Sequence, residues 1–130
     1  MKITNEKGVD VDDIIGPFDE DATLILVCIV TGGNPTPEVT WWQEERMIDR
    51  HAEVRHSEQG VARNVLQLER LGRVDLRTKL SCHASNTQLS QPLTKSVEIE
   101  LNRESYYKKH FFLLLLRYLL FTLRCDASSR

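Results

Sequence analysis

The chain has 130 residues, 41% of them hydrophobic and 28% charged, which suits one soluble domain with a single core. Its net charge of −2 is unevenly divided, because residues 103–130 carry +4 and the residues before them carry −6. An acidic domain lacks the electrostatic footprint of a nucleic-acid-binding protein, so we expect no nucleic-acid partner.

Short strands are predicted along most of the chain. Residues 1–21 are polar and acidic, and a short extended stretch around Gly16 and Pro17 predicts a lead-in strand at a sheet edge. The apolar, β-branched run 22–31 predicts a strand buried on at least one face. Further strands are predicted at 38–44, within the charged segment 45–60, and at 64–71, 77–85 and 92–101. About seven strands with no helix before residue 103 indicate an all-β sandwich or barrel.

Two cysteines and a tryptophan share the inward side of three of these strands. Trp41 follows Cys28 by 13 residues, and Cys82 lies 54 residues after Cys28. The third cysteine, Cys125, makes the number odd, so the count alone does not establish a disulfide. The shared orientation of the three residues is the stronger signal.

Three segments carry a resemblance to a known family. They are GNPTPEVTWW at 33–42, LQL at 66–68 and LSCHASN at 80–86. Together they resemble C2-type domains of the immunoglobulin superfamily, and more narrowly those of Sidestep-like and nephrin-like cell-surface proteins of animals. The resemblance implies an immunoglobulin-like Greek-key sandwich over residues 11–102. It also implies a disulfide between Cys28 and Cys82, with Trp41 packed against it in the core.

The sequence departs from the family pattern at one turn. Leu80 stands where the family usually has a tyrosine, two residues before the second cysteine. The usual Asp-x-Gly before it is missing as well, and Asp75 lies one residue too far away. We therefore expect the fold to be kept and the turn before this strand to be looser.

A candidate partner-binding face follows from the alternation of side chains. Trp42 comes directly after the core tryptophan, so it should point away from the core, and exposed aromatic residues are enriched in binding hot spots. The opposing interpretation is that its cross-strand neighbours cover Trp42. The predicted face consists of Trp42, Glu44, Lys79, His83 and Glu98.

Neither a metal site nor a catalytic site is predicted. His51, His56 and His83 do not stand at a recognised ligand spacing with a carboxylate or thiolate. The acidic residues lack a partner that would form an acid–base pair, and no nucleophile motif is present. We therefore expect no cofactor and no enzymatic activity.

The segment 103–130 forms a basic and apolar tail outside the predicted domain. Its apolar run at 111–123 is short for a membrane span and contains Arg117. Three interpretations stay open: a marginal lone anchor, a helix lying on the membrane surface near Lys108, Lys109 and Arg124, or a non-native tail from translation past an exon boundary. We favour the third, and Cys125 would then be a stray thiol.

The predicted function is recognition of another protein at the cell surface. The resemblance implies an immunoglobulin-type surface partner, in guidance or adhesion, bound through a sheet face. The alternative is a structural spacer domain without a ligand of its own. The first ten residues lack the apolar region of a signal peptide, so we expect a piece of a longer extracellular protein or an incomplete gene model. Membrane association would come from that parent protein or from the tail.

Overall fold

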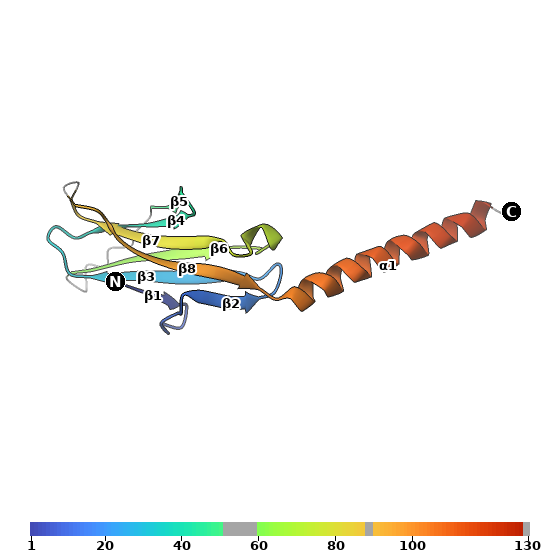
Figure 1. The fold of residues 1–130 in the computed structure, drawn as a ribbon, viewed down its shortest axis with the longest axis horizontal. Helices are drawn as coiled ribbons and strands as arrows, with labels where there is room; N and C mark the ends of the chain where they lie inside the picture. The colour runs from blue at the N-terminus through green and yellow to red at the C-terminus, as the bar shows by residue number, and fades with distance from the viewer. Residues whose placement is uncertain (51–59, 88–89, 129–130) are drawn as a thin grey trace.

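Two β-sheets pack face to face, and one helix extends from their end (Figure 1). The computed structural model describes residues 1–50, 60–87 and 90–128, and the side chains of the helix at 103–104 and 108–124. The first sheet has the order β1-β3-β6, and the second has the order β2-β8-β7-β4-β5. The strands are β1 (Lys2–Asn5), β2 (Ile14–Phe18), β3 (Leu24–Thr31), β4 (Glu38–Gln43), β5 (Arg46–Asp49), β6 (Val61–Leu68), β7 (Lys79–Ser85) and β8 (Leu93–Leu101).

The core lies between the sheets and is built by alternation along the strands. Strand β7 turns Leu80, Cys82 and Ala84 inward, and β8 turns Val97 and Ile99 inward, all of them buried. Strands β3 and β6 pair antiparallel over their whole length and supply the opposite wall. The predicted two-sheet β-sandwich is therefore confirmed.

The sandwich begins earlier in the chain than the predicted Val11. Strand β1 pairs antiparallel with β3 and places Ile3, fully buried, opposite Cys28. With β1 the two sheets have eight named strands instead of about seven. A strand of four residues between polar neighbours carries too little alternation to be recognised from its own sequence.

The predicted lead-in strand is β2, at the edge of the five-stranded sheet. It runs parallel to β8, with Ile15 opposite Ile99, and its register shifts before Phe18. Gly16 lies in this irregular part with a φ of 115°, where an added Cβ would collide with the Glu100 carbonyl oxygen. Gly16 is therefore required for the close approach of β2 to β8.

The turn between β6 and β7 has its own hydrogen bonds in place of the missing tyrosine. A short 3₁₀ helix, η1 (Arg73–Asp75), begins after Gly72. The Gly72 N–H donates to the Asp75 carboxylate at 2.8 Å, and the Thr78 N–H donates to the Asp75 carbonyl at 3.0 Å. Leu80 fills its position in the core without a hydroxyl group. The expectation of a looser turn therefore overlooked the role of Asp75.

Removing this carboxylate tests its role. We expect Asp75→Ala to lower the free energy of unfolding by about 1 kcal/mol, as for the loss of a helix cap. Asp75→Asn keeps an acceptor oxygen and should cost less. Urea unfolding of the two variants measures the difference. Equal stability of Asp75→Ala and the unmodified protein would show that the hydrogen bond to Gly72 is dispensable.

The tail forms one helix, α1 (Arg103–Ser128), which projects from the end of the sandwich where β8 ends (Figure 1). The junction is fixed by contacts to the last residue of β2 and to the segment that follows it. The Asn102 N–H donates to the Phe18 carbonyl at 2.7 Å, and Lys109 forms an ion pair with Asp21 at 2.9 Å. This pair lowers the pKa of Asp21 and raises the pKa of Lys109. Among the described residues, no helix combines the length and the apolar character needed to cross a membrane.

Candidate protein-binding face

The surface of the five-stranded sheet that faces away from the core is the candidate site, and we call it the outer face. Trp42 of β4 lies opposite Ser81 of β7, and Ser81 lies opposite Ser96 of β8. In the next rung Thr40 lies opposite His83. Inward residues such as Trp41 and Cys82 alternate with these positions and are buried. The predicted outward direction of Trp42 follows from this register.

Trp42 and His83 form a stacked pair on the outer face. Their ring centroids lie 5.0 Å apart with an interplanar angle of 16°. The Trp42 Nε1–H donates to the Thr40 hydroxyl at 2.9 Å, so its polar group is satisfied within the sheet. Trp42 is half-buried as a result. Its neighbours thus cover part of Trp42 while the rest remains accessible, and contact with a partner stays a prediction.

The surroundings of His83 also affect its charge. Partial burial, and to a smaller extent the positive charge of Lys79, lower the pKa of His83. The lowered pKa favours the neutral form of the imidazole at pH 7. A neutral, flat ring beside an indole offers a partner an aromatic surface with little desolvation cost.

Small hydroxyl side chains lie beside the two rings on β4, β7 and β8. The Ser81 and Ser96 hydroxyl groups are hydrogen-bonded at 2.9 Å, and Ser81 is buried. Thr40 is buried as well. Trp42 and His83 are thus flanked by short side chains on β7 and β8, while Met47 of β5, which is exposed, lies opposite Trp42.

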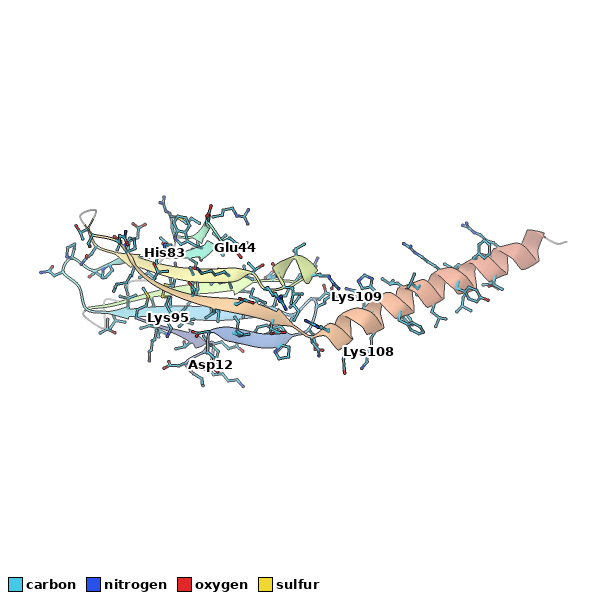
Figure 2. All side chains as sticks on the ribbon, in the orientation of Figure 1. Asp12, Glu44, His83, Lys95, Lys108 and Lys109 are labelled. Atoms are coloured by element: carbon cyan, nitrogen blue, oxygen red, sulfur yellow. A yellow bond between two sulfur atoms is a disulfide. The ribbon has the colours of Figure 1, made fainter. Side chains whose placement is uncertain are left out.

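Glu44 has a structural role at the end of β4. Its backbone N–H donates to the Lys79 carbonyl at 2.9 Å, and its carboxylate accepts the Lys79 N–H at 2.9 Å. Figure 2 labels Glu44 and His83 on the β4–β7 side of the sandwich. A carboxylate that already binds a backbone N–H has less capacity for a partner. Of the predicted face residues, Glu44 is therefore the weakest candidate for contact.

Two predicted residues flank the aromatic pair with opposite charges. Lys79 and Glu98 lie opposite each other in the β7–β8 register, and both are exposed. Charges at the rim of an interface affect the rate and specificity of association more than its affinity. The structure thus brings four of the five predicted face residues together on one surface, and assigns the fifth to the support of β4.

The buried side of the same strands holds the outer face in place. Cys28 and Cys82 form a disulfide between the two sheets, with their Cα atoms 6.3 Å apart. The Trp41 Nε1–H donates to the Asn64 carbonyl at 3.0 Å, and the Asn64 amide donates to the Val39 carbonyl at 2.9 Å. These bonds connect β4 to β6 across the core. Sequence reasoning overlooked Asn64, although its inward position between Ala62 and Leu66 was a usable signal.

The arrangement of the described residues also bears on metal binding. In that part of the chain, no group of three or more histidine, cysteine or acidic side chains is placed to hold a metal ion. His51 and His56, considered above as ligands, lie outside the described residues. His83 is engaged in the stack with Trp42.

Comparison with known proteins identifies the sandwich. Residues 14–93 match the family model of the CD80-like C2-set immunoglobulin domain. The crystal structure of Rst D1-D2 is similar over 78% of this chain and 48% of its own, with 22% identity and a TM-score of 0.58. The full ectodomain (Ig1–Ig3) of mouse nectin-like molecule 4 is similar over 76% of this chain and 32% of its own, with 13% identity and a TM-score of 0.59.

The similarity to these two structures supports a statement about the fold alone. At such identities the two structures show a shared fold, and the chain spans less than half of the length of either. No curated protein matches the sequence.

Proposed function

Because the chain belongs to the CD80-like C2-set immunoglobulin domains, we propose that it recognises another protein through its outer face. Domains of this family are typical of cell-surface recognition and adhesion proteins, and the Cys28–Cys82 disulfide fits an extracellular setting. The family is generally not enzymatic. As partner we propose another immunoglobulin-superfamily surface protein, in guidance or adhesion, on the strength of the resemblance to Sidestep-like proteins.

The observation that carries this proposal is the stacked pair of Trp42 and His83. Tryptophan is the residue most enriched in binding hot spots, and hot spots lie near the centre of an interface. Here the pair lies in the middle of a sheet face, among short hydroxyl side chains, with charged residues at its rim. A protein surface with an apolar pocket could enclose both rings.

Trp42→Ala is the direct test. We expect the variant to bind the partner at least about 30-fold more weakly, because truncation of a hot-spot residue costs about 2 kcal/mol or more. The partner is identified by screening the full chain against cell-surface ectodomains, and the dissociation constants are then measured by surface plasmon resonance. His83→Ala should weaken binding as well, because it removes the support of the indole.

A matched control is Val65→Ala, since Val65 is 42% exposed on the opposite sheet. It should leave both binding and stability nearly unchanged. Unfolding of Trp42→Ala would show that Trp42 belongs to the core. Unchanged affinity would contradict the proposed face, and a screen with no partner would favour the spacer function.

A further inference from the structure

Helix α1 presents a long apolar surface that the sandwich does not cover. The large apolar side chains from Phe111 to Leu123 are between 41% and 69% exposed. Exposed apolar surface of this extent marks a site of interaction with a protein or a membrane. The question is which of these the helix is built to contact.

Basic residues recur along one line of the helix. Arg103, His110, Arg117 and Arg124 are spaced seven residues apart. Each residue advances about 100° around the axis of an α-helix, so two residues seven apart differ by about 20° in angular position. The four residues therefore lie within an arc of about 60°. We call this line the basic stripe. No acidic residue lies between residues 105 and 124.

Between residues 111 and 123, with Thr122 as the exception, apolar residues and Tyr118 occupy nearly all of the remaining circumference. Opposite the basic stripe lie Phe112, Leu115, Leu119 and Leu123, which follow one another at helical spacing. A single partner helix would cover a narrow seam of such a surface. A lipid bilayer covers the whole arc and leaves the basic stripe at the level of the headgroups. The width of the arc therefore favours a membrane over a second copy of the helix.

We propose that α1 binds the surface of a bilayer that contains anionic lipids, with its apolar arc inserted and its basic stripe on the headgroups. Each lysine or arginine near an anionic membrane surface strengthens binding, and Arg103, Arg117 and Arg124 of the stripe supply this charge along the length of the helix. Arg117 lies in the middle of the apolar run, where a headgroup can reach it in this orientation.

The junction with the sandwich leaves this surface available. Lys109 is engaged by Asp21, which fixes the first turns of α1 to the domain. Figure 2 shows Lys108 and Lys109 at the start of the helix, next to the sandwich, while the apolar run lies farther out. The domain can therefore sit beside a membrane that holds the rest of α1.

Vesicle sedimentation of the full, oxidised chain tests the proposal. We expect at least about tenfold stronger partitioning onto vesicles of phosphatidylcholine with phosphatidylserine than onto phosphatidylcholine alone. Arg117→Glu/Arg124→Glu should reduce that partitioning by at least about tenfold. Added salt should weaken binding to the anionic vesicles. Leu115→Glu/Leu119→Glu should abolish it by breaking the apolar arc.

The matched control is Lys7→Glu/Arg63→Glu, which makes the same change in net charge on the sandwich. It should bind the anionic vesicles as the unmodified chain does. An equal loss of binding in this control, or equal binding to neutral and anionic vesicles, would overturn the proposal. A third outcome would also overturn it: the chain binds neither kind of vesicle but forms an oligomer in sedimentation velocity, and Leu115→Glu/Leu119→Glu dissociates this oligomer. In that case α1 would pair with a second copy of the chain. Unchanged melting temperatures confirm that the variants fold.

Discussion

Replacing Trp41 with alanine is expected to lower the free energy of unfolding by about 3–5 kcal/mol. Trp41 is fully buried, so the change opens a cavity between the sheets. It also removes the donor that bonds the Asn64 carbonyl across the core. Leaving a buried acceptor without this partner adds to the cost. Equilibrium urea unfolding, followed by the fluorescence of Trp42 or by circular dichroism, measures the loss.

The neighbouring tryptophan is the matched control. Trp42→Ala removes a side chain of the same type from the outer face, and it should cost much less stability because Trp42 is half-buried. Trp41→Phe keeps part of the core volume and should lie between the two. If the two alanine variants unfolded at the same urea concentration, the assignment of Trp41 to the core and Trp42 to the outer face would be wrong.

Loss of the disulfide is expected to have the second large effect. Cys28→Ala/Cys82→Ala should lower the free energy of unfolding by about 2–5 kcal/mol, as for native bridges in small secreted domains. The bridge closes a loop of 54 residues and thereby restricts the unfolded chain. Both cysteines are also fully buried in the core. Thermal melting with and without reductant gives the same comparison on the unmodified protein.

Cys125→Ala separates the disulfide from a general effect of removing thiols. Cys125 lies outside the bridge, in the helix that follows the sandwich. Its variant should melt as the unmodified protein does and should remain sensitive to reductant. If reductant left the melting temperature of the unmodified protein unchanged, the stabilising role of the Cys28–Cys82 bridge would be refuted.

Much of the fold could be predicted because buried strands alternate visibly. The runs around Cys82 and Ile99 show this alternation in the sequence, whereas the run around Cys28 was recognised as a continuous apolar, β-branched stretch. Strand β1 could not be recognised in this way. Its place depends on pairing with β3, which is a contact between distant residues rather than a local pattern.

The candidate site was predictable in direction but not in its contacts. The alternation of side chains along a strand was sufficient to predict that Trp42 points outward. The stack with His83 depends on the register of β4 against β7, where the two residues are diagonal neighbours. The role of Glu44 depends on a backbone N–H contributed by Lys79. Such a register cannot be derived from the sequence. The prediction from alternation therefore grouped Glu44 with the residues that would face a partner.

The direct passage from β8 into α1 has a mechanical consequence. Only Asn102 separates the strand from the helix, and β8 lies between β7 and β2 in the sheet. If α1 is held while the sandwich is pulled by a bound partner, the load runs along the axis of β8. The hydrogen bonds to both neighbours then resist together in shear instead of opening one at a time, because they lie across the direction of pull. Strand β8, which connects the domain to its helix, is thus hydrogen-bonded on both sides and resists being pulled out of the sheet.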